Sequence, residues 1–295
     1  MKYRRLTQSL FRRGKGLHSG LECALSIEPS DEALSLEIEG QRFFLSRLAL
    51  SGTGRGTDLI FPDGKRVRTC EHVLSALVGL GVWQAKLTLT GPGIAGPESG
   101  LEMPGLDGCA LDLAREVLEK SIPVQGPAPF RLSCPIRAGD SSRFVIALPS
   151  PSFRITYVID YDAAPIGTQI FDYLAPDAGA DADSERSGGD YLREIAPART
   201  FVLRKDVEAL RAAGLALGGS LDNAILVDEG GVETAGGLRF RDEFARHKVL
   251  DLLGDLANLG RPLAAHLVAV RAGHAQHLQM VEKLRAVSAR STRVR

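Results

Sequence analysis

The chain has 295 residues, of which 44% are apolar and 24% charged, a composition typical of a globular protein that buries a core in one large domain or two ordinary ones. Lysine plus arginine equals aspartate plus glutamate, 36 residues each, so no excess of positive charge favours a nucleic-acid partner. No run of about twenty apolar residues predicts a membrane-spanning helix, and we expect no stable membrane insertion.

The first part of the chain combines short strand patterns with Gly-rich turns. Strands are predicted at 3–10, 21–27, 34–38, 42–45, 59–61 and 86–90, and Gly-rich turns at 14–20, 51–56 and 91–100. Helices are predicted at 69–80, with Thr69 as the N-cap, and at 111–118. The segment 121–129 has three prolines and little apolar content, so we predict that it is a linker.

After this linker the same kinds of pattern return. Strands are predicted at 130–133, 143–148, 153–160, 224–227 and 264–270, and helices at 205–213, 240–260 and 276–287. Segment 191–203 mixes helix and strand character, 177–189 is a polar loop, and 288–295 is a basic tail. These patterns predict an α+β fold with two domains of similar type, residues 1–124 and 127–287, each a β-sheet layer with helices packed on one face.

The predicted helix 240–260 has two contrasting faces at 100° per residue. Its apolar face carries Ala245, Val249, Leu252, Leu253 and Leu256, and its opposite face His247, Asp251, Asp255 and Asn258, with Lys248 at the edge. His247 and Asp251 are four residues apart, so their side chains can reach a common point, as in many metal sites. From the helix alone, a solvent-exposed polar face is the favoured interpretation.

A second polar pair lies at the start of the predicted helix 69–80. Together with His247 and Asp251, His72 would complete the two imidazoles and one carboxylate of a catalytic zinc site. Its neighbour Glu71 would then act as a general base toward water. The same ligand set makes the facial triad of non-haem iron oxygenases, so oxygenation stays an alternative. Nothing in the spacing shows that these segments meet.

The other histidines and the cysteines carry weaker signals. His274 lies at a predicted strand-to-helix turn, a place where function is common. We expect His18 to fix its turn or a contact between domains, and His266 and His277 to be structural. The cysteines at 23, 70, 109 and 134 form no CxxC pair, which favours a reducing, cytoplasmic compartment.

Ordered motifs resemble those of the UDP-3-O-acyl-N-acetylglucosamine deacetylases, the zinc enzymes of lipid A synthesis. They are GLHSG at 16–20, TCEHVLSAL at 69–77, EMPGLDGCA at 102–110, ARTF at 198–201, GGSLDNA at 218–224, LRFRDEFARHKVLD at 238–251 and GH at 273–274. They follow the family's order over nearly the whole chain. The departures are an insertion at 91–100, Leu106 and Cys109 within the third motif, and two alanines at 163–164 where Asn-His is common.

The resemblance implies a catalytic role at each matching position. The metal, Zn²⁺ with Fe²⁺ as the alternative, would be held by His72, His247 and Asp251. Glu71 would be the general base, and His274 the general acid or oxyanion stabiliser, oriented by Asp255. Thr200 and Lys248 would lie beside the tetrahedral intermediate, and the whole site would lie between the two domains.

The resemblance also implies the substrate contacts. Asp160 and Tyr161 match a segment near UDP, and Arg271 stands where the family commonly has a lysine beside the diphosphate; arginine also binds phosphate. Segment 202–232 matches an insert that forms a passage for the acyl chain, with apolar surface from Phe201, Leu203 and Leu215. We therefore expect a cytoplasmic, monomeric deacetylase of UDP-3-O-acyl-N-acetylglucosamine. The alternatives are another metal-dependent amidohydrolase on a nucleotide sugar, or a non-catalytic nucleotide-sugar or lipid-binding homologue.

Overall fold

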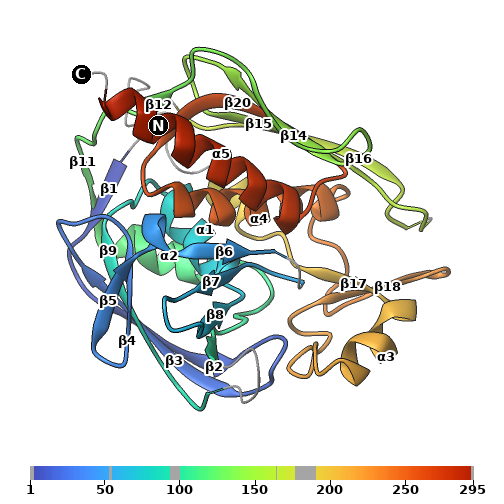
Figure 1. Ribbon diagram of the computed structural model, residues 1–295. Coiled ribbons are helices and arrows are strands. Elements are labelled where there is room, and N and C mark those ends of the chain that lie inside the picture. Colours follow the sequence, from blue (N-terminus) through green and yellow to red (C-terminus); the bar gives the residue numbers. More distant parts are fainter. Residues whose placement is uncertain (1–2, 53–54, 94–99, 164, 177–190, 294–295) are drawn as a thin grey trace.

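The computed structural model describes residues 3–52, 55–93, 100–163, 165–176 and 191–293 (Figure 1). The predicted polar loop 177–189 and most of the predicted turn 91–100 lie outside these residues. The fold is α+β, as predicted, with sheets and helices drawn from both parts of the chain. None of the described helices combines the length and the apolar character needed to cross a membrane.

Residues 3–124 form three sheets. The largest has the order β2 (Leu10–Lys15), β3 (Glu22–Pro29), β9 (Ala85–Thr90), β4 (Ser35–Ile38) and β5 (Gln41–Phe44). A second has the order β10 (Gly100–Glu102), β8 (Arg66–Arg68), β7 (Asp58–Ile60) and β6 (Ala49–Ser51). The third pairs β1 (Tyr3–Leu6) with β11 (Ser121–Val124), so the start of the predicted linker is a strand. Two helices accompany these sheets, α1 (Glu71–Gly79) and α2 (Leu111–Glu119).

Residues 130–293 form two more sheets and three helices. One sheet has the order β13 (Ile136–Gly139), β14 (Phe144–Pro149), β20 (Leu263–Val270), β15 (Arg154–Asp160) and β16 (Thr168–Leu174), with β12 (Phe130–Arg131) beside β20. The other has the order β17 (Phe201–Leu203), β18 (Ile225–Asp228) and β19 (Gly231–Glu233). The helices are α3 (Arg204–Ala212), α4 (Glu243–Leu256) and α5 (His274–Arg293), and short helical turns occur at η1 (Leu45–Arg47), η2 (Tyr191–Ile195) and η3 (Ala257–Leu259).

The helices α1, α4 and α5 occupy the middle of the molecule. In Figure 1, α4 and α5 lie under the sheet that contains β14, β15 and β20, while α1 and α2 lie above the sheet that contains β3, β4 and β9. Helix α1 packs against α4, and α4 packs against α5. Within the described residues, every strand pairs only with strands from its own side of segment 125–129.

The contact between α1 and α4 depends on a glycine. A Cβ atom at Gly254 of α4 would lie 2.0 Å from the backbone oxygen of Glu71, so a larger residue would force the helices apart. Helix α1 is anchored by apolar side chains such as Val73, Leu74 and Leu77, each fully buried. Burial of one such side chain stabilises the fold by about 1.5–3 kcal/mol, which offsets part of the cost of burying Glu71.

Several local predictions were wrong, and the strands β6, β10 and β13 had no predicted counterpart. Thr69 is not an N-cap, because Cys70 precedes α1 directly. The Thr69 backbone is left-handed, with a φ of 55°, and its hydroxyl donates to Glu102 Oε1 at 2.9 Å. Strands β16 and β19 were not predicted; β16 is an edge strand that exposes Ile170 and Leu174, which obscures its alternation. Helix α5 begins earlier than predicted, at His274, and runs to Arg293, into the predicted basic tail.

The polar face of the predicted helix 240–260 is not exposed to solvent. Helix α4 begins at Glu243, after a turn closed by the hydrogen bond from Glu243 N to Phe240 O. The short helix η3 continues α4 as far as Gly260, where a left-handed φ of 74° ends it. Every residue of α4 is buried except Arg246 and Lys248. Asn258, expected on the solvated face, is also fully buried and donates to Asp255 O at 3.1 Å.

Candidate active site

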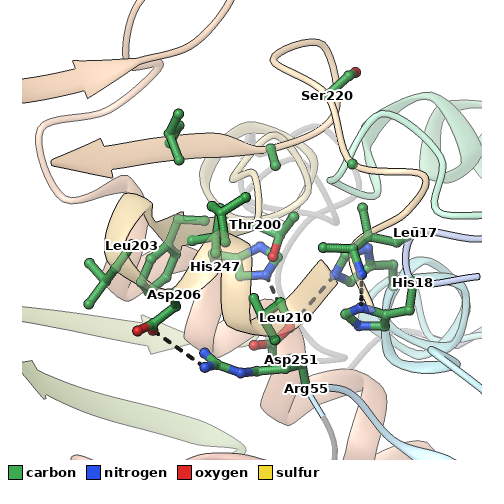
Figure 2. Close-up of a pocket in the computed structure, with 18 of the residues that line it drawn as sticks. Leu17, His18, Arg55, Thr200, Leu203, Asp206, Leu210, Ser220, His247 and Asp251 are labelled. Carbon is green, nitrogen blue, oxygen red and sulfur yellow. Dashed lines mark hydrogen bonds and ion pairs between the residues drawn. The ribbon is translucent and has the colours of Figure 1, made fainter. Parts of the chain in front are cut away.

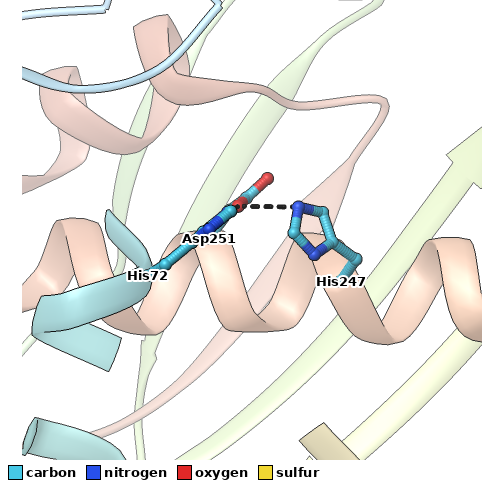
Figure 3. A group of neighbouring side chains, drawn as sticks. All are labelled: His72, His247 and Asp251. Atoms are coloured by element: carbon cyan, nitrogen blue, oxygen red, sulfur yellow. Dashed lines mark ion pairs between the residues drawn. The ribbon is translucent and has the colours of Figure 1, made fainter. Parts of the chain in front are cut away.

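Three buried side chains from α1 and α4 form a group suited to a metal ion. The ligand atoms of His72, His247 and Asp251 all lie within 4.8 Å of one another (Figure 3). Asp251 Oδ1 is 3.3 Å from His247 Nε2 and 3.8 Å from His72 Nε2. Within the described residues this carboxylate oxygen is buried without a hydrogen-bond partner, an arrangement that a cation would satisfy. His72 therefore completes the ligand group that the four-residue spacing of His247 and Asp251 suggested.

The ionisation of these three groups also fits a divalent metal. Burial, and then the neighbouring His247, lower the pKa of His72 to about 3. Burial likewise lowers the pKa of His247, whose Nδ1 lies 3.1 Å from Ala198 O and so carries the proton, which leaves Nε2 as a free ligand atom. Burial acts to raise the pKa of Asp251, but His247 and Lys248 outweigh it and hold that pKa well below its ordinary value. Two neutral imidazoles and a carboxylate are ligands that Zn²⁺ and Fe²⁺ both accept.

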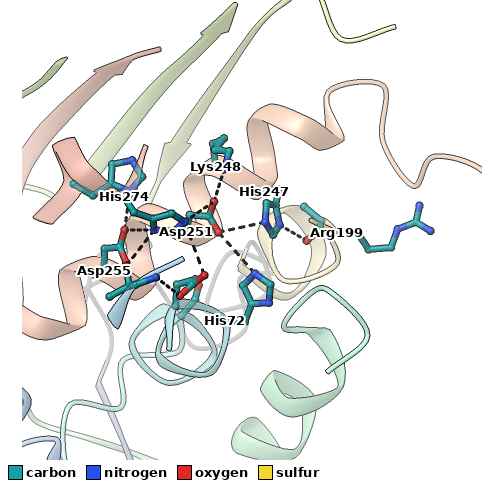
Figure 4. Close-up of polar contacts among 12 residues, drawn as sticks. His72, Arg199, His247, Lys248, Asp251, Asp255 and His274 are labelled. Atoms are coloured by element: carbon teal, nitrogen blue, oxygen red, sulfur yellow. Dashed lines mark hydrogen bonds and ion pairs between the residues drawn. The ribbon is translucent and has the colours of Figure 1, made fainter. Parts of the chain in front are cut away.

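Glu71 lies beside this group at the start of α1. Its Oε2 accepts a hydrogen bond from Thr57 N at 3.0 Å, and its Oε1 lies 3.9 Å from His274 Nε2 (Figure 4 shows the cluster). Burial raises the pKa of Glu71 to about 7, with further upward effects from Asp251 and Asp255 and an opposing effect from His274. A carboxylate with a pKa near neutrality is suited to accept a proton and later release it.

His274 opens α5 and faces the same group. Its Nδ1 lies 2.8 Å from Asp255 Oδ2, and its Nε2 lies 3.7 Å from Asp251 Oδ2. Burial acts to lower the pKa of His274, but the carboxylates of Asp255, Glu71 and Asp251 together outweigh it and raise the pKa to about 9. The ring is therefore an imidazolium at neutral pH, with Nε2–H directed toward the site.

Lys248 and Thr200 complete the polar set expected from the sequence. Lys248 Nζ donates to Asp251 Oδ2 at 2.8 Å and lies 5.4 Å from the centre of the Phe201 ring. Burial acts to lower the pKa of this lysine, but Asp251 outweighs it and raises the pKa above its ordinary value. Thr200 is held by backbone hydrogen bonds to Gly108 O and from Ile225 N, both 2.8 Å long.

Two further side chains in the cluster were missed from the sequence as functional candidates. The Thr57 hydroxyl donates to Asp255 Oδ1 at 2.5 Å, and its amide holds Glu71. His277 Nδ1 lies 2.8 Å from Asp255 Oδ2, the same oxygen that His274 contacts. Nothing in the Gly-rich turn 51–56 points to its neighbour Thr57. The three-residue spacing of His274 and His277 on a helix was a signal that they share a face.

A cavity of about 300 Å³ opens from this cluster (Figure 2). Its polar end is lined by Glu71, His72, His247, Lys248, Asp251 and His274. Its other end is mainly apolar and is lined by Leu17, Phe201, Leu203, Val207, Leu210, Ala224 and Leu226. Tyr161 and Thr200 also contribute to the wall. The cavity thus joins a reactive centre to an apolar channel.

The remaining predicted substrate residues lie outside this lining. Asp160 and Arg271 form an exposed ion pair of 3.4 Å between Oδ2 and Nη1, at the ends of β15 and β20. Leu215 follows α3 and bonds through its amide to Leu210 O at 2.8 Å; its side chain is not part of the wall.

The sequence motifs meet in space around the cavity. The amides of His18 and Ser19 donate to the two carboxylate oxygens of Glu102, at 2.8 and 2.7 Å. His18 Nδ1 also accepts from Ala216 N at 3.4 Å, so this turn contacts the second part of the chain. Arg199 and Glu243 form a buried ion pair, with Nε 2.9 Å from Oε1, that ties the start of β17 to the start of α4.

Gly108 allows another of these motifs to meet its partner. Its φ is 75°, and a Cβ atom there would lie 1.8 Å from the backbone oxygen of Asn223. The motif at 102–110 therefore packs directly on the motif at 218–224, which it could not do with a side chain at this position.

The fold and the site together define the class of candidate metal-dependent hydrolases: a buried His–His–Asp group beside a carboxylate and an imidazolium, at one end of an apolar cavity. The chain belongs to the UDP-3-O-acyl N-acetylglycosamine deacetylase family, whose model matches residues 4–286. The resemblance expected from the motifs is thereby confirmed.

Individual relatives agree with this assignment. The chain is 36% identical to the UDP-3-O-acyl-N-acetylglucosamine deacetylase of Acidithiobacillus ferrooxidans over 96% of this chain and 90% of the relative. It is also 36% identical to the deacetylase of that name from Anaeromyxobacter dehalogenans, over 92% and 84% of the two chains. It is 34% identical to the one from a Nostoc species, over 98% of this chain and 100% of the relative.

Proposed function

We propose that this protein hydrolyses the acetamide of UDP-3-O-acyl-N-acetylglucosamine, releasing acetate and UDP-3-O-acyl-glucosamine, as a step of lipid A biosynthesis. Family membership supports the reaction and the substrate. The observation that carries it is the convergence of His72, His247 and Asp251 with Glu71 and His274 at the polar end of an apolar cavity. An acetyl group at this end and an acyl chain in the channel would fit such a substrate.

We propose Zn²⁺ as the metal of the His72, His247 and Asp251 group. Bound there, it would activate water and polarise the acetyl carbonyl as a Lewis acid. The orphaned oxygen of Asp251 and the low pKa values of both imidazoles support a divalent cation at this point. Fe²⁺ would satisfy the same ligands.

In the proposed reaction the protein's own residues move two protons. The Glu71 carboxylate, held by Thr57 N, takes a proton from water as the water oxygen bonds to the acetyl carbon. The imidazolium of His274 stabilises the negative charge that develops on the carbonyl oxygen. As the C–N bond breaks, His274 gives its Nε2 proton to the departing nitrogen, so the free amine and acetic acid form. The acid releases its proton to water and leaves as acetate, and the proton held by Glu71 passes to His274 and restores the starting state. Lys248 adds a positive charge beside the same centre.

The rest of the substrate would follow the shape of the cavity. We propose that the acyl chain lies along Leu203, Val207 and Leu210, with Phe201 and Tyr161 at the junction with the sugar. The exposed pair of Asp160 and Arg271 would contact UDP, where arginine suits the diphosphate.

The wider arrangement is also a proposal. The sheets before and after segment 125–129 would be two domains, residues 1–124 and 127–287, with the site between them. The separation of strand pairing at this segment and the origin of Glu71 on α1 and His247 on α4 support it. A monomer in the cytoplasm remains our expectation for the working protein.

The test combines metal analysis of the purified protein with acetate release from UDP-3-O-acyl-N-acetylglucosamine substrates of several acyl lengths. We expect about one metal ion per chain, loss of acetate release after chelation, and recovery with Zn²⁺ without oxygen. Turnover that requires O₂ and Fe²⁺ would contradict hydrolysis. Tight substrate binding without acetate release by the metal-loaded protein would make it a binding protein instead.

A further inference from the structure

Asp255, buried in the middle of α4, holds two imidazoles on one oxygen. Its Oδ2 lies 2.8 Å from His274 Nδ1 and 2.8 Å from His277 Nδ1. Its Oδ1 accepts the Thr57 hydroxyl. Asp255 and His277 are both fully buried, and the proposed reaction uses His274 but gives His277 no task.

The chemistry of these contacts fixes the proton on His277. His274 and His277 hold the pKa of Asp255 below its ordinary value against the opposing effect of burial, so the carboxylate is ionised and can only accept hydrogen bonds. His277 Nδ1 must therefore carry a proton and donate it to Oδ2. On the other side of the ring, Nε2 lies 2.8 Å from the hydroxyl of Tyr157 and can accept its proton; the same hydroxyl lies 2.8 Å from Ala272 O. The ring is thus fixed at both nitrogens.

Helix geometry explains why both histidines reach the same oxygen. His274 and His277 lie three residues apart on the first turn of α5, so their side chains share a face, and their ring centres are 5.7 Å apart. That face is turned toward α4, where Asp255 lies. Without His277, Oδ2 of Asp255 would keep a single donor, His274, whose own orientation depends on it.

We infer that His277 is a positioning residue for the deacetylation: its Nδ1–H holds the carboxylate of Asp255 in the orientation that in turn aligns His274. This inference rests on the proposed function and on the role proposed there for His274. His277 is not among the residues that line the cavity, and among the contacts of the described residues it touches none of His72, His247 and Asp251. It would act through the hydrogen bond to Asp255, while its ring also meets that of His274 edge-on.

The two ring nitrogens allow this role to be separated from a purely structural one. An asparagine carries its amide nitrogen on Cγ, as histidine carries Nδ1, so His277→Asn can keep the bond to Asp255. A glutamine places its amide near the position of Nε2, so His277→Gln can keep the contact with Tyr157 and lose the one with Asp255. If His277 served only to tie α5 to β15 through Tyr157, the glutamine variant would be the better enzyme.

The experiment measures kcat, KM, metal content and melting temperature of the metal-loaded protein with its acylated nucleotide-sugar substrate. We expect His277→Asn to keep kcat within about 3-fold of the unmodified protein and His277→Gln to lose about 10–100-fold in kcat, with KM and metal content unchanged. If His277→Gln does not fold, His277→Leu takes its place with the same expectation. The matched control is His266→Asn, since His266 lies on β20 and contacts Thr156 at 2.9 Å, away from the site.

A double-mutant cycle with Asp255→Ala completes the test. In that background we expect His277→Gln to cost less than about 3-fold in kcat, because its effect passes through the missing carboxylate. The inference fails if His277→Gln is as active as His277→Asn, or if its loss persists undiminished in the Asp255→Ala protein. An unmodified, metal-loaded protein that releases no acetate would overturn the proposed function itself. The unmodified protein could instead be active and the Asp255→Ala variant inactive, while His277→Asn and His277→Gln have the same kcat. That result would overturn this inference and leave the proposed function standing.

Discussion

The two ends of the cavity are built in different ways. At the polar end, Glu71, His72, His247, Asp251 and His274 all lie on helices and are at most 9% exposed. At the apolar end, the wall comes mainly from the short strands β17 and β18 and from α3, and Leu221, which also lines it, is 45% exposed. One end is part of the core of the protein and the other lies at its surface.

This difference matches the role that we propose for each end. Charge stabilisation and proton transfer need groups held in fixed positions, and helices packed in a core hold them with hydrogen bonds on both sides. Binding an acyl chain depends mainly on apolar area removed from water, which tolerates looser geometry. We therefore expect substitutions at the polar end to lower kcat or metal content, and those at the apolar end to raise KM for long-chain substrates only.

The largest effect is expected from His247→Ala, which removes a proposed metal ligand from the polar end. The protein should fold, since α4 keeps its apolar contacts, but should lose its bound metal and at least about 1,000-fold in kcat/KM. Metal analysis, circular dichroism and acetate release measure the three properties. Retention of full activity would refute the metal assignment, and His266→Ala, outside the site, serves as the control that keeps both metal and activity.

The next effect is expected from Gly254→Ala, which adds one methyl group and no charge. Its Cβ would lie 2.0 Å from Glu71 O, so α1 must move away from α4 and carry Glu71 and His72 with it. A displacement of about 1 Å at a reacting group can cost about 100-fold in rate. We expect a loss of that order in kcat and a lower melting temperature. The control for kcat is Gly64→Ala, which has nothing within 4 Å of its Cβ and should leave kcat unchanged, although its φ of 85° strains the alanine and lowers the melting temperature. Unchanged kcat in Gly254→Ala would mean that the polar end is not rigid.

Resemblance to the deacetylase family predicted the polar end of the cavity better than the periodicity of the sequence did. Periodicity placed His247, Asp251 and Asp255 on one face of a helix, and α4 confirms that they share it. Periodicity could not show what covers this face of α4. The interpretation drawn from the helix alone, a solvated face, was wrong because α1 and α5 pack against α4. His72 joins the group from a segment 175 positions earlier along the chain than His247, a distance that no local pattern reports.

Other parts of the site had no local signal at all. Thr57 acts through both its amide and its hydroxyl, and Glu243 through its ion pair with Arg199, and each depends on partners from distant segments. Threonine is a residue type that suits an N-cap, but the left-handed backbone of Thr69 does not have the geometry of one. Element types were predicted well where a long period was present. They were predicted poorly for the three-residue strand β19 and for the edge strand β16, whose exposed Ile170 and Leu174 hide its alternation.

A smaller effect is expected from Leu203→Ala at the apolar end. Leu203 lines the channel, and losing its contact with an acyl chain should cost about 1–2 kcal/mol of binding, at about 0.8 kcal/mol for each buried methylene. KM for long-chain substrates should rise about 5–30-fold, while kcat, and KM for a short-chain substrate, stay the same. Leu174→Ala, an exposed leucine away from the cavity, is the matched control. A fall in kcat with every chain length would show that the two ends are not separate.

The smallest effect is expected at the mouth of the cavity, where Arg55 and Asp206 form an ion pair of 3.4 Å between the two parts of the chain (Figure 2). Their side chains are 53% and 32% exposed, and a pair so open to water contributes at most about 1 kcal/mol. Arg55→Ala and Asp206→Ala should each change KM by less than about 5-fold, and the coupling between them should disappear in high salt. A coupling well above 1 kcal/mol that survives salt would mean that this pair closes over the bound chain. The apolar end would then be ordered by its substrate, and the contrast with the preformed polar end would hold only for the empty protein.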